Sequence, residues 1–364
     1  MNRRKFIAAG GVGLAATAVA APAIAQSAPA LNWRLVASWP KSLDTLFGGA
    51  AYFAQLVGEM TDQKFQIRAF AGGELVPPLQ VLDAVQNGTV ELGHTAPYYY
   101  VGKDPTFTFD CTAPFGANYR IQNAWLRNGG GRALMDEFYA GYNVVSIPCG
   151  NTGTQAGGWW RKEIKTVHDL KGVKFRIGGW GGAVLSKLGV VPQMLAGGDI
   201  YPALEKGTID GAEWVGPYDD ERLGFQKVCK YYYHPGWWEG QAQLSAYINL
   251  DKWRALSKTY QAVIRAAAAE ANNWMIAKYD ADNPAALKRL IAGGTQLRYW
   301  SRPIMEACFN ASRQLYAEES ARNPKFKKVY DEWTPFLATE DEWMRVDEQQ
   351  FDNFMYAKVG SRRA

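Results

Sequence analysis

The sequence predicts an α/β protein of two lobes, each a mainly parallel sheet flanked by helices, followed by a long helical C-terminal tail. Two observations support this fold class. A series of alternating strands and helices occurs twice along the 364 residues, and one segment of the first series is echoed in the second. Such β-α-β-α-β series are typical of parallel sheets with crossover helices. The chain length also favours two domains over one.

The first series covers residues 33–93. Apolar residues at helical spacing predict a helix over 46–60, and Pro77-Pro78 opens a second helix that ends near Gln86. Strands are expected at 33–38, 65–69 and 89–93, and in the second of them apolar residues alternate with polar ones.

The second series repeats this order, with strands expected at 144–148, 173–177, 190–191 and 208–212 and helices at 180–188 and 200–206. Residues 84–91 resemble residues 203–210: in both, a helix ends at a glycine and a threonine follows. If the parallel holds, His94-Thr95 and Glu213-Trp214 lie at equivalent strand ends, where open parallel sheets bind ligands. Chance, or convergence on a common turn, is the alternative.

The remaining chain returns and then becomes helical. A strand is expected at 246–250, a helix capped by Ser257 reaches about Tyr279, another helix ends at Gly293-Gly294, and a strand follows at 295–300. Thr339 with Glu342 fits a capping box. Behind it lies one helical stripe: Trp343, Val346, Gln350, Phe351, Phe354 and Met355. The stripe is either core or, if exposed, a docking surface for a second subunit.

The N-terminus has the pattern of an export signal. Arg3-Arg4-Lys5 precede a Gly/Ala-rich apolar stretch and Ala23-Ile24-Ala25, which predicts a twin-arginine-like signal peptide over 1–25. The alternative, a membrane anchor, needs about 20 apolar residues, more than this stretch has. Without the three basic residues, 37 Lys and Arg face 35 Asp and Glu, which is no electrostatic footprint for nucleic acid.

Cysteines and catalytic motifs offer little. Cys111, Cys149, Cys229 and Cys308 form no C-x-x-C pair, and four cysteines allow three disulfide connectivities, so buried free thiols are the preferred interpretation. Three separated histidines suggest no zinc site. The sequence has no G-x-S-x-G, P-loop or H-E-x-x-H motif, so an enzyme would lack a candidate nucleophile.

Arg176 is the first candidate for binding chemistry. It ends a predicted strand, just before Gly178-Gly179. A guanidinium near a strand's carboxyl end is costly to bury without an anion, and its fork can hold a carboxylate through two hydrogen bonds. The alternatives are a structural salt bridge or an exposed strand residue.

A second constellation consists of Gln155, Glu213, Trp214 and Glu239. Oxygen donors of this kind suit a hard cation such as Na⁺ or Ca²⁺ and not zinc. A cation would also offset the repulsion between the glutamates and an anionic ligand. The alternative is that both glutamates are solvated loop residues. Nearby aromatic runs, such as Tyr98-Tyr99-Tyr100, are pocket walls or core.

The chain resembles the periplasmic solute-binding subunits of tripartite ATP-independent periplasmic (TRAP) transporters, most of all the TakP-type branch that binds 2-oxo acids. The most specific matches are GGDIYPALEKGTID at 197–210, EWVGPY at 213–218 and PGWWEG at 235–240. Further matches lie at 42–44, 71–77, 98–105 and 150–153, and KGVKFR at 171–176 is typical of the wider family.

This resemblance implies a periplasmic-binding-protein fold and a role for each site residue. It implies that Arg176 binds the ligand carboxylate. It also implies that Gln155, Glu213, Glu239 and the Trp214 carbonyl hold a metal ion, Na⁺ first and Ca²⁺ as the alternative. Asn151 and Tyr100 are placed near the pocket by position.

The resulting expectation is a non-catalytic periplasmic protein that captures a 2-oxo monocarboxylate such as pyruvate and delivers it to TRAP permease subunits. Lobe I is expected at 26–150 plus about 240–280, and lobe II at 151–239 plus about 281–335. A C-terminal helix at 336–364 would join a homodimer. Alternatives are a receptor for lactate, another 2-hydroxy acid or a larger anion, a periplasmic enzyme acting on an organic acid, and a structural or sensory partner.

Overall fold

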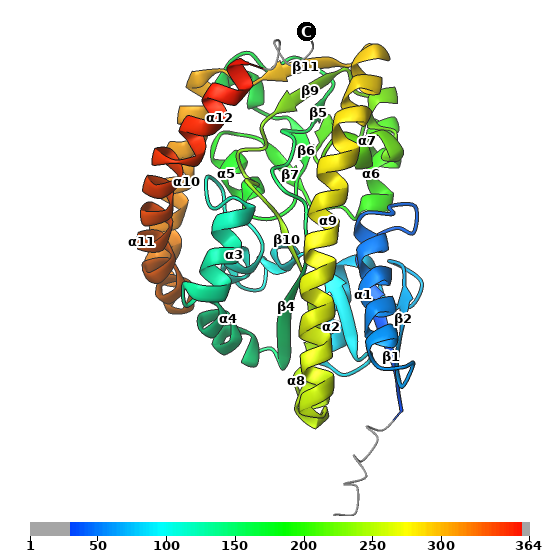
Figure 1. The fold of residues 1–364 in the computed structure, drawn as a ribbon. Coiled ribbons are helices and arrows are strands. Elements are labelled where there is room, and N and C mark those ends of the chain that lie inside the picture. Colours follow the sequence, from blue (N-terminus) through cyan, green and yellow to red (C-terminus); the bar gives the residue numbers. More distant parts are fainter. Residues whose placement is uncertain (1–29, 359–364) are drawn as a thin grey trace, which may run out of the picture.

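The computed structural model describes residues 30–358 and contains two mixed sheets covered by helices (Figure 1). The predicted signal peptide lies outside these residues. The first sheet has the order β2(Phe65–Phe70), β1(Leu31–Ala37), β3(Leu92–Thr95), β10(Gln243–Asn249), β4(Val144–Asn151). The second has the order β11(Gln296–Tyr299), β9(Tyr231–His234), β5(Trp159–Trp160), β8(Gly211–Ala212), β6(Lys174–Arg176), β7(Val191–Gln193). The predicted two-sheet α/β architecture is confirmed.

Both sheets contain parallel pairs and one inserted antiparallel strand. In the first, β1 pairs in parallel with β2 and β3, whereas the late strand β10 runs antiparallel between β3 and β4. In the second, β6 pairs in parallel with β7 and β8, and β5 runs antiparallel to β8 and β9. The chain therefore returns to the first sheet after building most of the second.

The two similar segments, residues 84–91 and 203–210, form the same kind of turn. After α2(Val81–Gln86), Thr89 N–H donates to Ala84 O (2.9 Å), and after α6(Gly197–Glu205), Thr208 N–H donates to Ala203 O (3.0 Å). Gly88 (φ +71°) and Gly207 (φ +70°) supply the left-handed residue in each turn. Because the threonines close these turns, the strands expected at 89–93 and 208–212 begin later, at β3 and β8.

The long helix α9(Lys258–Ala292) extends along much of the molecule (Figure 1) and packs directly on β4 of the first sheet. Ser257 caps it as predicted, accepting from Tyr260 N–H at 3.2 Å. The prediction of a break near Tyr279 was wrong: Tyr279, Ala286 and Leu290 are all buried, so one helix continues to Gly293.

The other helices cover the sheets and form the C-terminal flank. They are α1(Leu46–Met60), α3(Tyr119–Asn128), α4(Gly131–Ala140), α5(Gly181–Lys187), α7(Pro217–Leu223), α8(Leu250–Ala255), α10(Arg302–Arg322), α11(Pro324–Val346) and α12(Glu348–Ala357). No helix within 30–358 is long and apolar enough to cross a bilayer. All four cysteines are buried free thiols, as preferred.

The capping box at Thr339 was wrong. α11 begins fifteen residues earlier, where Asn323 accepts from Lys325 and Phe326 N–H (both 3.1 Å), and the Thr339 hydroxyl donates to Pro335 O inside the helix (3.1 Å). The stripe behind it is not core: Trp343, Phe351 and Phe354 are exposed by 53%, 64% and 62%.

A buried carboxylate joins the layers of the two sheets. Thr45, just before α1, donates to Asp219 Oδ1, and Tyr279 of α9 donates to Oδ2, both at 2.7 Å. α1 packs on the first sheet, whereas Asp219 lies in α7, which follows β8 of the second. Burial raises the pKa of Asp219 to about 6, and the two hydroxyls only partly oppose this. The contact therefore links the two layers through a titratable group.

Asp219 should make stability depend on pH. Its folded pKa lies above the ordinary value of 3.8, so its contribution is fully present below that value and is lost as the pH rises through about 6. The difference in unfolding free energy between wild type and Asp219→Asn should fall by up to about 3 kcal/mol between acidic and neutral pH. Urea unfolding at several pH values measures it, with exposed Asp331→Asn as the control. A difference that is constant with pH would contradict this assignment.

Candidate functional site

Two neighbouring strands bring Arg176 and Glu213 together. Arg176 ends β6 and pairs with Ala212 of β8, and Glu213 follows directly. Both side chains are fully buried. Arg176 Nη1 donates to Glu213 Oε1 (2.5 Å) and to the Glu213 carbonyl (2.9 Å), and Nε donates to Leu195 O (3.1 Å). A structural salt bridge, one of the alternatives given for Arg176, is therefore present, and it uses one edge of the guanidinium.

The other edge of the guanidinium is unsatisfied. Arg176 Nη2 is buried and has no hydrogen-bond partner among the described residues. A buried donor without an acceptor costs about 1–3 kcal/mol, and more when it is charged. The ion pair and a role in ligand binding are thus compatible.

Three side chains of the neighbouring segments also have buried oxygens without partners among the described residues. Glu213 Oε1 accepts from Arg176 and from Gly178 N–H (2.7 Å), but Oε2 has no partner within residues 30–358. The same holds for both carboxylate oxygens of Glu239 and for Oε1 of Gln155. All three side chains are at most 3% exposed. They are therefore not solvated loop residues.

Backbone hydrogen bonds hold the segments of this cluster together. Gln155 N–H donates to Glu239 O (3.0 Å), and Gly236 N–H donates to Gln155 O (2.8 Å). Gly236 allows this approach, because a Cβ there would lie 2.7 Å from Ala156 O. Ala156 N–H in turn donates to Val215 O (2.9 Å), beside Glu213.

One contact fixes the orientation of the Gln155 amide. Its Nε2 donates to Thr152 Oγ1 (3.1 Å), and that hydroxyl oxygen also accepts from Ala242 N–H (3.1 Å). The Gln155 amide nitrogen therefore has a hydrogen-bond partner, whereas its amide oxygen has none among the described residues.

Electrostatics favour a cation here. Burial raises the pKa of Glu239 well above its ordinary value and Glu213 raises it further, whereas Arg176 and the nearby Tyr98 hydroxyl oppose both. Burial also raises the pKa of Glu213 against the pull of Arg176. Burial disfavours the charged guanidinium, but Glu213 and other nearby groups outweigh it, so the pKa of Arg176 is raised. Two carboxyl groups thus lie near a single positive charge, the Arg176 guanidinium. A metal ion would supply the missing positive charge.

The donor set fits a hard ion. It combines two carboxylates with one amide oxygen, and such oxygens suit Na⁺ or Ca²⁺. Over the described residues, no group of three or more His, Cys, Asp or Glu is arranged to hold a metal ion, so a site here would need the Gln155 oxygen and a carbonyl beside the two glutamates.

Aromatic rings enclose the cluster. The Trp214 ring lies under the Arg176 guanidinium at 4.9 Å and meets Trp39 edge-on at 6.3 Å. Trp39 Nε1 donates to His94 Nδ1 (2.7 Å), which orients its ring. Tyr98 packs so closely on Gly178 that a Cβ there would lie 2.6 Å from its ring. The ring centroid of Tyr99 lies 6.0 Å from that of Trp39.

Tyr100 and Asn151 have other partners. The Tyr100 hydroxyl accepts from Leu82 N–H (3.1 Å) and contacts Thr95 Oγ1 (3.0 Å), in the core. Asn151 donates to Gln241 Oε1 (2.6 Å) and accepts from Gly153 N–H (2.9 Å). Their expected place beside the ligand stays a prediction.

Tyr99 and Trp39 were not singled out from the sequence. Tyr98, Tyr99 and Tyr100 occupy one turn of 3-10 helix (Pro97–Tyr100), so their side chains point in different directions. The signal was present, but a run of three tyrosines does not tell which of them faces a site. Trp39 lies two residues beyond β1, and no pattern marked it.

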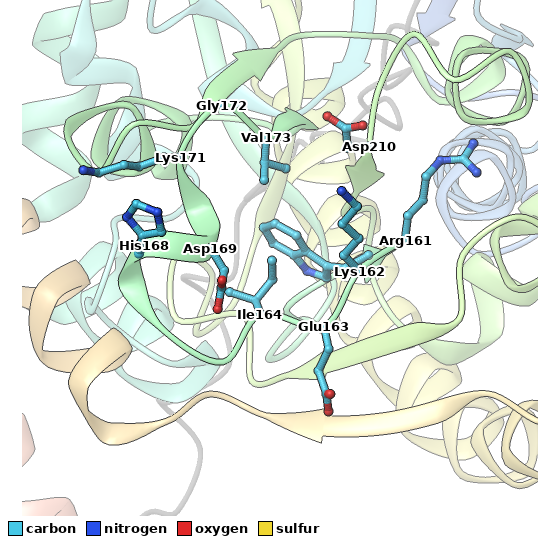
Figure 2. A pocket seen from close by; sticks show the side chains of 11 residues that line it. Arg161, Lys162, Glu163, Ile164, His168, Asp169, Lys171, Gly172, Val173 and Asp210 are labelled. Carbon is cyan, nitrogen blue, oxygen red and sulfur yellow. The ribbon is translucent and has the colours of Figure 1, made fainter.

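Figure 2 shows a different hollow, of about 360 Å³, on the second sheet. Its acids are already engaged: Asp210 accepts from Lys174 N–H (2.9 Å), Asp169 from Thr166 N–H (2.8 Å), and Glu163 pairs with Arg298. None of the predicted site residues lines it. The orphaned polar atoms therefore identify the Arg176 cluster as the stronger candidate.

Comparison with known proteins points to one family. The profile described as bacterial extracellular solute-binding protein, family 7 (DctP), matches residues 36–323. A monocarboxylate 2-oxoacid-binding periplasmic protein of Nostoc is 48% identical over 360 residues, which cover 97% of this chain and 99% of that protein.

Solved structures agree. A TRAP transporter solute-binding protein of Bordetella bronchiseptica, a mixed-occupancy dimer with calcium and picolinate in its occupied site, is 53% identical, with a TM-score of 0.91 over 92% of this chain and 99% of that one. A TRAP periplasmic solute-binding protein of Pseudoalteromonas atlantica with sodium and pyruvate is 35% identical, with a TM-score of 0.86 over 89% and 98%.

The crowding of two carboxyls predicts an unusual mutant. In potassium buffer with a chelator, Glu239→Gln should be at least as stable as wild type, because burial and Glu213 already disfavour the charged carboxylate and a neutral amide cannot ionise there. The control is Glu319→Gln: Glu319 is equally buried but paired with Arg322, so its loss should destabilise by about 1–3 kcal/mol. Denaturant unfolding compares them. Equal destabilisation of both variants would show that Glu239 is an ordinary structural acid.

Proposed function

Because the chain belongs to family 7 of the bacterial extracellular solute-binding proteins, the solute receptors of TRAP transporters, we propose that it captures a short 2-oxo monocarboxylate such as pyruvate together with a metal ion. One observation carries the proposal. Arg176 Nη2 and oxygens of Gln155, Glu213 and Glu239 are buried in one cluster without partners among the described residues.

The ligand's chemistry matches these orphaned atoms. A 2-oxo acid presents a keto oxygen beside a carboxylate oxygen, and this pair chelates a hard cation. Gln155, Glu213, Glu239 and the Trp214 carbonyl would complete the ion's shell. The second carboxylate oxygen would accept from Arg176 Nη2, a charge-assisted hydrogen bond in a water-excluded site.

Charge balance narrows the choice of ion. Two glutamates, Arg176 and a monocarboxylate sum to two negative charges. Ca²⁺ would neutralise them, whereas Na⁺ would leave one in place. Both ions occur in the similar structures, sodium in the Pseudoalteromonas protein and calcium in the Bordetella protein. The ion is therefore Na⁺ or Ca²⁺, and Ca²⁺ should hold the anion more tightly.

A second candidate ligand is an aromatic carboxylate. The Bordetella protein contains picolinate, which carries a chelating nitrogen next to its carboxylate. Picolinate and pyruvate share that arrangement, so the same cluster suits both. The rings of Trp39, Trp214 and Tyr99 would stack on an aromatic ligand more favourably than on a methyl group.

Capture would involve two lobes closing. We place lobe I at 26–150 plus about 240–280 and lobe II at 151–239 plus about 281–335. Contacts between the two layers, such as Thr45 with Asp219, support a closed arrangement here. Family membership also supports capture without turnover and delivery to a permease, and the Nostoc relative's name supports a periplasmic location.

The C-terminal helices would join two copies. Trp343, Val346, Phe351, Phe354 and Tyr356 are all more than half exposed, a cluster of large apolar side chains on α11 and α12. Apolar patches of this kind mark interaction surfaces. The Bordetella structure is a dimer. We therefore assign residues 336–364 to a homodimer contact.

Calorimetry tests the ligand. Pyruvate should bind with Na⁺ or Ca²⁺ and much more weakly in potassium buffer with a chelator. Arg176→Lys keeps the charge but loses the fork, and it should lower affinity by about 100-fold or more. Arg298→Lys, at a surface pair, is the control. Absence of pyruvate binding in every ion would refute the ligand, and tight picolinate binding would then favour the second candidate.

Light scattering tests the dimer. The double variant Phe351→Asp/Phe354→Asp should convert a dimer into a monomer, because it places charges in an apolar contact. Its melting temperature at low protein concentration should match that of wild type. Gln349→Asp on the same helix is the control. A monomeric wild type, or a double variant that remains dimeric, would show that α12 does not form the dimer contact.

A further inference from the structure

A basic cavity lies on the first-sheet half of the molecule. It has a volume of about 520 Å³ and lies between the end of α3, the start of α4, β4 and α9. Arg127, Arg132 and Arg265 line it together with Asn128, over apolar side chains that include Leu126 and Ile147. None of its lining residues belongs to the Arg176 cluster.

Positive charge in this cavity is under-compensated. No acidic residue lines it. Asp136, one turn along α4, pairs with Arg132. The Arg127 side chain has no hydrogen bond or ion pair with any residue in the described part of the chain. Two carboxyls lie near the three guanidiniums, Asp136 and the buried Asp110, and Asp110 already accepts hydrogen bonds from Tyr139 and Ser146.

Two of these arginines are incompletely compensated by their neighbours. Arg265 is fixed over the Trp253 ring (4.9 Å), and its pKa is lowered by burial and by the charge of Arg132, with Asp136 offsetting only part of this. Arg132 Nε is buried and has no partner within residues 30–358. A bound anion would relieve the repulsion and satisfy the donor.

The helix start adds donors at the same place. α4 has ten residues and begins at Gly131, and its N-cap, Gly130, offers no side chain to its first N–H groups. These groups and the helix dipole favour an anion there. Arg132, the second residue of this helix, lines the cavity, so the helix begins next to it.

We propose that this cavity is a second binding site, for a doubly charged oxyanion such as phosphate or a short phosphate monoester. Guanidinium forks suit phosphate oxygens, and the three arginines outnumber the carboxyls near them, Asp136 and Asp110, so positive charge is left to neutralise. The volume is that of a small-ligand pocket, and Leu126 and Ile147 offer a surface for a short carbon body. No metal is required, unlike at the Arg176 cluster.

The same chemistry has two sources, a soluble phosphate compound or an anionic lipid headgroup. Calorimetry of the full chain with inorganic phosphate, at constant ionic strength and with chloride as the comparison anion, tests the first. Co-sedimentation with vesicles of phosphatidic acid, compared with phosphatidylcholine, tests the second.

Saturable binding to one site is expected in at least one arm. Arg127→Ala/Arg265→Ala should weaken it by about tenfold or more. Arg127→Lys/Arg265→Lys, which keeps the charge, should also weaken it. The control, Arg302→Ala/Arg313→Ala on α10, should change it little. Pyruvate affinity should be unaffected in all of these variants, and Arg176→Lys should leave phosphate binding intact.

Three outcomes would overturn the proposal. They are no saturable binding in either arm, equal binding of chloride, and equal weakening by the α10 control. Phosphate and pyruvate are titrated separately. A failed phosphate titration therefore leaves the proposed capture of a 2-oxo acid intact, and a failed pyruvate titration leaves the phosphate site intact. A melting-temperature check separates loss of the site from misfolding of a variant.

Discussion

A buried guanidinium paired on only one edge is the constraint on which the rest of the site depends. Removing Arg176 and Glu213 from water costs several kcal/mol for each ion, and their mutual attraction repays this only when the remaining polar atoms are also satisfied. In this protein they are not: Arg176 Nη2 and Glu213 Oε2 remain without partners among the described residues. Such a pair weakens the isolated fold, and a ligand and an ion that supply the missing contacts would stabilise it. The same contacts would therefore bind the ligand and favour the closed form.

The fold is arranged to hold that constraint in place. β6 and β8 are adjacent and parallel, so Arg176 and Glu213 emerge at the same sheet edge. Glycines at 178 and 236 let the Tyr98 ring and the Gln155 backbone approach within distances that a Cβ would forbid. The core is continuous between the two sheets, since Leu35 and Leu92 belong to the same apolar cluster as Trp159 and Ala212. The Trp39 ring thereby comes from the first-sheet side to meet Trp214 on the second, with the Tyr99 ring beside Trp39.

Local patterns in the sequence predicted local structure well. The helix over 46–60, the Ser257 cap and the echoed turns at Gly88 and Gly207 depend on spacing and backbone conformation, which neighbouring residues determine. The element boundaries that were predicted wrongly depend on tertiary contacts. Tyr279 continues α9 because it reaches Asp219, and α11 begins at Asn323 instead of at the capping signal of Thr339. Resemblance and residue chemistry drew attention to Arg176, Gln155, Glu213 and Glu239, and the structure brings these four together. The pairing of Arg176 with Glu213, and the role of Trp39, depend on contacts between segments far apart in the chain, which no periodicity reveals.

The most direct measurement of the central claim is a crystal structure of the protein grown with calcium and pyruvate, with the ion identified by anomalous scattering. One ion is expected, bound by Gln155, Glu213, Glu239 and the Trp214 carbonyl, with the ligand's carboxylate on Arg176 Nη2. An anion bound elsewhere, with Arg176 satisfied by protein atoms alone and Gln155 and Glu239 turned into water, would contradict it.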